Sequence, residues 1–147
     1  MHPQIREATP ADLLHILAVY REARLAKRGS LSLEEATSIH AKMKRYPNYK
    51  VYVAEIKGQI VGTFELLIID NLANGGRPSG LVEDVAVLPS FQGQGIGKEM
   101  MRFAMNRCKE HRCYKMALSS NETRTDAHRF YESLGFSRHG FSYRIEP

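Results

Sequence analysis

Apolar residues recur along this chain with two different periods, that of a helix and that of a strand. After Thr9-Pro10, a pair suited to a helix start, apolar side chains return every three or four positions up to Tyr20. Ser32 and Glu35 have the spacing of a capping box, which predicts a second helix ending near Pro47. Shorter apolar runs between turn residues predict strands at residues 5–8, 51–56, 60–69, 81–88, 114–119 and 141–145. Lys57-Gly58, between the second and third of these strands, indicates a hairpin.

Two further helices complete the predicted order of elements. One follows the strand at 81–88 and runs to about residue 112, and the other starts at Thr125 or Asp126 and stops at Gly135. The resulting order, β-α-α-β-β-β-α-β-α-β, predicts a mixed α/β fold. The chain has 147 residues and contains no linker, repeat or low-complexity stretch, so we expect one domain over residues 1–147.

Three alternating glycines separate the strand at 81–88 from the helix that follows it. Gly93, Gly95 and Gly97 come directly before an apolar face with helical spacing. Glycines let a backbone approach a ligand closely, and the first turn of a helix offers unpaired N–H groups and the positive end of its dipole. The segment therefore predicts a phosphate-binding loop, with a plain tight turn as the alternative.

Two familiar phosphate-binding loops do not fit this spacing. A Walker loop ending at Gly97-Lys98 would need a glycine at Gln92 and a hydroxyl residue at Glu99. A dinucleotide-binding loop starting at Gly93 would need its third glycine at Lys98. Both are excluded, and the pattern that remains is Gln-x-x-Gly-x-Gly.

Charge and composition narrow the class of ligand. The formal net charge is +5, which suits an anionic partner, but the basic residues are scattered and form no block, so we expect no nucleic-acid partner. No apolar run has the ~20 residues of a membrane span, and the first residues lack the apolar core of a signal peptide. Cys108 and Cys113 have the character of packed thiols. We expect a cytoplasmic protein that has no metal site and does not bind membranes.

The Gln92-x-x-Gly95-x-Gly97 pattern resembles the pyrophosphate loop of the GCN5-related N-acetyltransferases, the GNAT family. A second block, Asn121 followed by Phe130-Tyr131-x-x-x-Gly135-Phe136, resembles a later block of the same family at the expected separation. The resemblance implies the GNAT fold with a splayed fourth strand, and acetyl-CoA as co-substrate. Residues implied to hold it are Val85, Ala86, Val87, Gln92, Gly93, Gln94, Gly95, Ile96, Gly97, Lys98, Asn121 and Tyr131.

The resemblance also implies catalytic roles. An alkyl ammonium has a pKa of ~10, so the reaction needs a base to produce the neutral amine and an acid for the departing thiolate. The family favours Glu83 as the base and Tyr131 as the acid. Neighbouring strand residues face opposite sides, so Glu83 or Asp84, and not both, should face the reacting groups. Each of these residues also has a purely structural interpretation. Glu83 could be a hydrogen-bonded or paired acid, Tyr131 a core aromatic residue, and Asn121 a helix cap or turn residue.

The residues of the second block, from Asn121 to Tyr131, are most similar to those of aminoalkylphosphonate N-acetyltransferases. The strand before the glycine loop is also similar to that of amino-sugar-phosphate N-acetyltransferases. This implies direct acetyl transfer to a small primary amine that carries a phosphonate or phosphate. Protein or peptide acetylation and a non-catalytic acyl-CoA-binding domain are the alternatives. A homodimer is the assembly that the family suggests.

Overall fold

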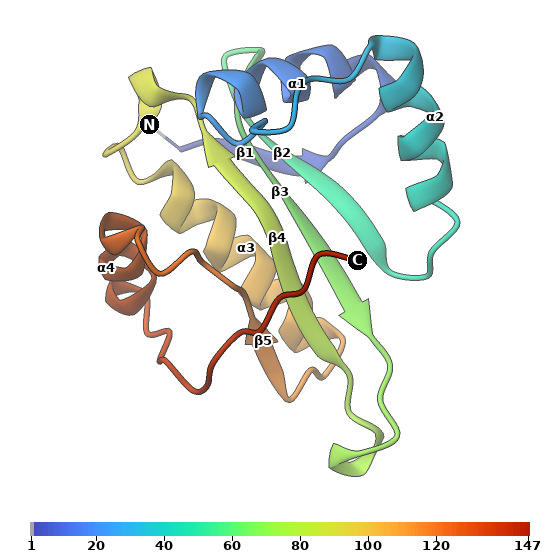
Figure 1. Cartoon of the computed structure of the whole chain (residues 1–147), viewed down its shortest axis with the longest axis vertical. Helices are drawn as coiled ribbons and strands as arrows, with labels where there is room; N and C mark the ends of the chain where they lie inside the picture. The colour runs from blue at the N-terminus through green and yellow to red at the C-terminus, as the bar shows by residue number, and fades with distance from the viewer. Residues whose placement is uncertain (1) are drawn as a thin grey trace. The chain divides into compact units, whose positions relative to one another are not determined.

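The computed structural model describes residues 2–147 (Figure 1), which fall into two compact units, Met1–Ala117 and Leu118–Pro147. Each unit is described by itself. The first unit holds the sheet and three of the four α-helices of the described chain. Its elements are β1 (Gln4–Glu7), η1 (Pro10–Asp12), α1 (Leu13–Glu22), α2 (Leu33–Met43), β2 (Tyr49–Ile56), β3 (Gln59–Ile69), η2 (Asn74–Gly76), β4 (Ser79–Val87), η3 (Pro89–Phe91), α3 (Ile96–Glu110) and β5 (Lys115–Ala117).

The order of strands in the sheet is the same as their order in the chain, β1-β2-β3-β4-β5. The first four strands pair antiparallel, and β5 pairs parallel with β4 after the α3 crossover. Lys57 and Gly58 join β2 to β3 with φ angles of 50° and 81°. Positive φ at both central residues is the turn geometry that suits a two-residue hairpin. The predicted hairpin and the mixed α/β class are therefore confirmed.

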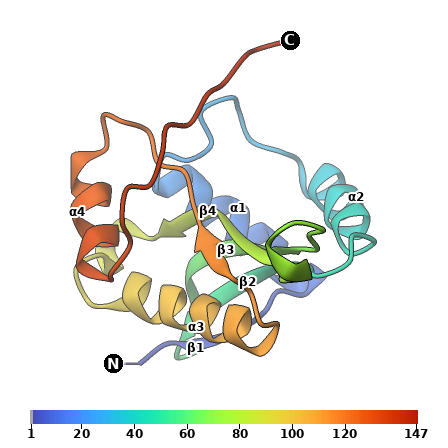
Figure 2. The ribbon, with the colours of Figure 1, turned by 90° about the horizontal axis from the view of Figure 1, so that it is seen from below.

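Helices cover both faces of this sheet (Figure 2). A Cβ at Gly62 of β3 would lie 2.8 Å from Sδ of Met100, so Gly62 faces α3. The next residue, Thr63, interacts with Tyr20 of α1, because successive strand residues point to opposite faces. The sheet thus has an α3 face and an α1 face.

The core on the α3 face is built from aromatic rings. The ring of Tyr52 stacks on Phe64 at a centroid distance of 5.2 Å and meets the edge of Phe103 at 5.0 Å. Met100, Met101 and Ala104 of α3 are fully buried. This packing fixes α3, and with it the loop that precedes α3, against the middle of the sheet.

Polar contacts fix the starts of both N-terminal helices. Ser32 Oγ accepts a 3.1 Å hydrogen bond from the Glu35 N–H, and the Glu35 carboxylate accepts one of 2.8 Å from the Ser32 N–H, which confirms the predicted capping box. Before α1, the buried Asp12 accepts two hydrogen bonds from Arg6, which hold the pKa of Asp12 well below its usual range.

The second unit contains α4 (Thr125–Ser133), close to the predicted helix. The strand predicted at 141–145 was wrong for this structure, since the residues of 118–147 form no strand. Phe141, Tyr143 and Ile145 are 90%, 92% and 88% exposed. Their alternation suits a strand face, but a strand needs a hydrogen-bonded neighbour, and no ladder is formed here.

Among the described residues, no helix has both the length and the apolar composition that crossing a membrane would require.

Gly80 of β4 gives a test of how closely α3 packs on the sheet. A Cβ at Gly80 would overlap Sγ of the buried Cys108 and lie 3.6 Å from Cγ of Met116. We expect Gly80→Ala to lower the free energy of unfolding by about 1–3 kcal/mol through overpacking, as measured by urea denaturation.

The matched control is Gly140→Ala, because nothing lies within 4 Å of a Cβ at Gly140. Adding Cys108→Ala to Gly80→Ala should recover part of the loss, since it removes the overlapping sulfur. Additive losses in the double variant would contradict this account of the packing.

Candidate functional site: a glycine loop and a carboxylate cluster

The glycine loop between β4 and α3 turns sharply through two left-handed residues. Gly93 and Gly95 have φ angles of 77° and 83°, a region that L side chains rarely adopt. Nothing lies within 4 Å of a Cβ placed on either glycine, so the backbone there is open to a ligand. Gln92 donates a 3.0 Å hydrogen bond to the Val87 carbonyl, and Gln94 donates one of 3.1 Å to the Ser90 carbonyl. The two glutamines therefore brace the loop and leave its glycines exposed.

The loop ends in the first turn of α3. Gly95 is the N-cap, and the first backbone bond of the helix runs from the Glu99 N–H to the Gly95 carbonyl at 3.1 Å. The N–H groups of Ile96, Gly97 and Lys98 come before that bond, and no side chain caps them. A helix of 15 residues directs its positive dipole end to the same place. These features suit a phosphate group, as expected from the sequence.

The neighbouring strand has an open edge. Pairing between β4 and β5 covers only Ser79 to Leu81, although β4 continues to Val87. On its other side, Ala86 and Val87 are registered with β3. This is the separation of strands that the resemblance implied. Within the first unit, one side of β4 therefore has no hydrogen-bonded strand from Val82 to Val87, next to the glycine loop (the yellow-green strand in Figure 1).

A β-bulge interrupts β4 just before this stretch. Glu83 is registered with Glu65 of β3, whereas Asp84 and Val85 have no registered partner, and Asp84 has a left-handed φ of 49°. The expectation that only one of Glu83 and Asp84 faces the reacting groups assumed a regular strand, and the bulge removes that assumption. Glu83 lies opposite Glu65 in the register, Asp84 follows Glu83 in the chain, and the charges of the three interact; we call Glu65, Glu83 and Asp84 the carboxylate cluster.

Two tyrosines complete this carboxylate cluster. The Tyr49 hydroxyl donates a 2.5 Å hydrogen bond to the carboxylate of Glu65, which is 9% exposed. Tyr20 of α1 interacts with the charges of Glu65 and Asp84. Burial is the main cause that raises the pKa of both hydroxyls; the hydrogen bond to Glu65 comes next for Tyr49, and the nearby charges add to the rise for both. Both hydroxyls therefore stay protonated. The cluster lies on the α1 face of the sheet, where Thr63 meets Tyr20.

Each carboxyl group in the cluster has a raised pKa. Burial is the main cause at Glu83, and the neighbouring Asp84 adds to it. Burial alone raises the pKa of Asp84, and at Glu65 burial outweighs the hydrogen bond from Tyr49. Glu83 and Asp84 still have surface open to solvent. Accessible carboxylates with raised pKa values are suited to accept a proton, and their summed charge attracts an ammonium group.

Three residues at this site were not predicted from the sequence: Tyr20, Tyr49 and Glu65. Glu65 did leave a signal, because it is the one charged residue within the apolar run at 60–69. A carboxylate in a strand buried on both faces needs a partner, which is here the Tyr49 hydroxyl. The two tyrosines left no such signal, because aromatic residues are ordinary in a helix face and a strand.

In the second unit, Asn121 builds a turn ahead of α4. Its Oδ1 accepts hydrogen bonds from the Thr123 N–H at 3.0 Å and the Thr123 hydroxyl at 2.7 Å. The ring of His128 bonds the Asn121 carbonyl at 2.8 Å, so His128 supports this turn. The turn role considered for Asn121 is therefore present. The turn uses the side-chain oxygen of Asn121 and not its amide N–H groups.

Tyr131 lies half-buried on α4 between two aromatic rings. Its ring centroid is 5.1 Å from that of Phe130 and 5.6 Å from that of Phe136. Burial raises the pKa of Tyr131, and the charge of Arg124 opposes the rise. The packing fits a core aromatic, while a protonated phenol also fits a proton donor.

Comparison with known proteins places these features in a family. The sequence profile of the acetyltransferase (GNAT) family matches residues 15–136, which span both the glycine loop and Tyr131. Glucosamine 6-phosphate N-acetyltransferase of Trypanosoma brucei brucei is 37% identical over 97 residues, covering 66% of this chain and 64% of that protein. Aminoalkylphosphonate N-acetyltransferase of Salmonella typhimurium is 30% identical over 97 residues, covering 66% of this chain and 62% of that protein.

A solved structure supports the match over the whole fold. The crystal structure of a Trypanosoma brucei acetyltransferase superposes with a TM-score of 0.84, at 32% identity and with 99% of each chain covered. The two curated relatives are matched over less than two thirds of their own length. The family profile, by contrast, covers most of this chain. With the left-handed glycine loop at the start of α3 and the open edge of β4, these matches establish that the chain belongs to the GNAT acetyltransferase family.

Proposed function

We propose that the protein is an acetyl-CoA-dependent N-acetyltransferase that acts on a small primary amine by direct transfer in a ternary complex. The observation that carries the proposal is one continuous path, in which the open edge of β4 leads past three carboxylates into a loop suited to phosphate. A non-catalytic acyl-CoA-binding domain would need the edge and the loop, but it would have no use for three neighbouring carboxylates, of which Glu65 is buried and Glu83 and Asp84 are exposed. Such a cluster costs stability and is typical of a functional site.

The residues present fit acetyl-CoA. The open, left-handed Gly93 and Gly95 allow the backbone to approach a pyrophosphate, and the N–H groups of residues 96–98 would donate to it. The main-chain groups of Val85, Ala86 and Val87 lie along the open edge of β4, where the pantetheine arm would pair as an added strand. Asn121 would donate from its amide group.

Bound acetyl-CoA would supply an acetyl group as a thioester. In the proposed mechanism, Glu83 accepts a proton from the acceptor ammonium, directly or through water, so that a neutral nitrogen can form the new bond to the acetyl carbon. Tyr131 donates its proton to the sulfur as the carbon–sulfur bond breaks, so that coenzyme A leaves as the free thiol. The nitrogen loses its second proton as the amide forms, and this proton restores the Tyr131 phenol, directly or through water. No step requires an acyl-enzyme, so neither cysteine has to react: Cys108 is buried, and burial raises the pKa of its thiol to about 12.

The acceptor we propose is a small amine with a phosphonate or phosphate group. Two relatives are named for such acceptors, an amino-sugar phosphate and an aminoalkylphosphonate. The carboxylate cluster would bind the ammonium end, because opposite charges attract and the cluster is partly desolvated. The same cluster favours a second candidate, a multiply cationic acceptor such as a lysine peptide. The two candidates differ in the charge that the acceptor carries besides its reacting ammonium group, which is negative in the first and positive in the second.

A homodimer in the cytoplasm remains part of the proposal. The exposed alternation of Phe141, Tyr143 and Ile145 supports it, since a strand formed by this segment could pair with a sheet edge of a second copy. Sedimentation of the full chain against a variant with serine at all three positions would test it. A wild-type monomer at micromolar concentration would exclude the dimer.

The glycine loop gives the first test of acetyl-CoA binding. Gly95→Ala places a methyl group where the pyrophosphate would approach, and we expect about a tenfold or greater loss of affinity for coenzyme A by calorimetry. Gly58→Ala is the matched control, because Gly58 has a φ of 81°, close to the 83° of Gly95, and equally open surroundings. Equal affinities of the two variants would remove the loop from the proposed site.

The carboxylates give a pH-dependent test. A base must be deprotonated to work, so kcat/KM should rise with pH through the raised pKa of Glu83. Asp84→Asn removes a like charge, which should lower that pKa and move the rise to lower pH. Glu83→Gln should reduce kcat by ~10²-fold or more. If Glu83→Gln keeps its activity while Asp84→Asn loses it, the base is Asp84.

The acid role of Tyr131 is separable from its packing role. Tyr131→Phe keeps the ring between Phe130 and Phe136 and removes only the hydroxyl, so we expect turnover to fall by ~10²-fold with little change in coenzyme A affinity. The exposed Tyr143 provides the control Tyr143→Phe. Unchanged turnover in Tyr131→Phe would leave Tyr131 as a packing residue.

The acceptor class is tested by comparing kcat/KM across matched amines. The informative pairs are an aminoalkylphosphonate against the corresponding uncharged alkylamine, and glucosamine 6-phosphate against glucosamine, with a lysine peptide as a third arm. We expect the phosphonate or phosphate member of each pair to have the larger value. A larger value for the peptide would favour the multiply cationic acceptor, and the acetyltransferase proposal would stand.

A further inference from the structure

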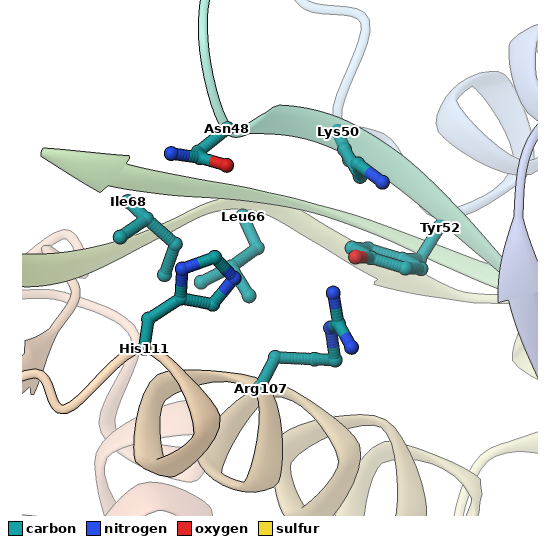
Figure 3. Close-up of a pocket in the computed structure, with 7 residues that line it drawn as sticks. All are labelled: Asn48, Lys50, Tyr52, Leu66, Ile68, Arg107 and His111. Carbon is teal, nitrogen blue, oxygen red and sulfur yellow. The ribbon is translucent and has the colours of Figure 1, made fainter.

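A small pocket opens on the α3 face of the sheet, near the carboxyl end of α3 (Figure 3). Its volume is about 80 Å³, and its apolar floor is formed by Leu66 and Ile68 of β3. One water occupies about 10–15 Å³ of such space, so the pocket can hold several waters or one group of the size of a phosphate. Neither the glycine loop nor the carboxylate cluster contributes to it.

Each of the polar side chains that line this pocket can donate a hydrogen bond. Asn48, Lys50 and Tyr52 come from β2 and the turn before it, and Arg107 and His111 come from the end of α3 (Figure 3). No lining residue carries a carboxylate. A ring of amide, ammonium, phenol, guanidinium and imidazole groups matches a ligand whose surface consists of acceptors, and an oxyanion is such a ligand.

Tyr52 supplies an independent indication of a ligand. The residue is only 5% exposed, its ring packs between Phe64 and Phe103, and its hydroxyl points into the pocket (Figure 3). Within residues 2–147 this hydroxyl makes no hydrogen bond, and Ser120 Oγ is the one fully buried side-chain polar atom without a partner, so the Tyr52 hydroxyl keeps accessible surface and can donate to a ligand. A donor held in place by core packing and directed at an empty space indicates a binding group.

The cations keep capacity for a ligand despite their ion pairs. Lys50 pairs with Glu7 at 3.2 Å, and Arg107 pairs with Glu110 through Nη1 alone. Across the described chain, Nε and Nη2 of Arg107 make no hydrogen bond. Glu7, Glu110 and the partial charge of about −0.5 at the carboxyl end of α3 offset the two positive charges, so a ligand here would be held by hydrogen-bond donors directed into the pocket more than by net charge.

The pocket is separate from the proposed acetyl-transfer site. Leu66 lines the pocket and its neighbour Glu65 belongs to the carboxylate cluster, so the two sites face opposite sides of β3. The glycine loop stands at the other end of α3, about 20 Å away for a helix of 15 residues. An anion bound here would not serve as acceptor or as co-substrate.

We propose that this pocket is a second anion site that takes a phosphate group, either as free inorganic phosphate or as the end of a small phosphate monoester. It does not depend on the acetyltransferase proposal, because its ligand, residues and face of the sheet are different.

The test is a titration of the full chain with inorganic phosphate and, separately, with glycerol 2-phosphate, followed by residue-resolved NMR at constant ionic strength. We expect saturable shifts at Asn48, Lys50 and His111 with either probe, and none with chloride. The probe that binds more tightly identifies the source of the phosphate group. Shifts at the glycine loop would report phosphate binding at the proposed acetyl-CoA site, and they do not count as binding in this pocket.

Variants make the assignment specific. Arg107→Gln should weaken binding about tenfold or more, and Tyr52→Phe, which removes one hydroxyl, about three- to tenfold. The matched control is Arg102→Gln, because Arg102 also pairs with a glutamate three residues away on α3 but does not line the pocket. If Arg107→Gln fails to fold, the phosphate affinity of Tyr52→Phe alone tests the proposal. Linear shifts without saturation, or equal affinity in wild type and Tyr52→Phe, would overturn the proposal.

Discussion

β4 changes its hydrogen-bonded neighbours partway along its length, and the rest of the candidate site depends on that change. Over its first three residues β4 is held between β3 and β5, and beyond Leu81 only β3 holds it. A strand with one free edge offers main-chain donors and acceptors to a ligand without disturbing the sheet. The same strand leads directly into the glycine loop, so the edge and the loop form one surface.

The bulge at Asp84 is the second part of that arrangement. A regular β4 would direct one of two adjacent carboxylates toward α3, into a core of methionines and aromatic rings. The left-handed turn at Asp84 avoids that cost and groups both carboxylates with Glu65. Left-handed geometry is unfavourable for a residue with a side chain, and such strain is commonly kept where function requires it. As a result, the sheet carries negative charge on its α1 face and basic groups at one end of its α3 face.

The sequence was a good guide where local chemistry decides the structure. The glycines before α3, the capping box at Ser32 and the hairpin at Lys57-Gly58 each have a specific backbone requirement, and each was predicted. Prediction from the sequence failed where the local structure depends on a residue that is far away in the chain. The bulge arises from the register between β3 and β4, and the pairing of Glu65 with Tyr49 joins residues 16 apart. The apolar alternation at 141–145 predicted a strand, but alternation alone does not provide the neighbour that a strand needs.

The agreement between strand order and chain order has a consequence for the way the protein folds. β2, β3 and β4 form consecutive antiparallel pairs, whose contacts are close in sequence, whereas β5 can pair only after α3 has crossed the sheet. Because contacts with small sequence separation form fastest, the β2–β4 meander should be an early folding unit. Glu65 and Glu83 would then come together before α3 docks, which makes the loop at the start of α3 a late-forming structure. Pulsed hydrogen exchange during refolding would show this as protection of β3 amides ahead of those in α3, and simultaneous protection would argue for one cooperative step.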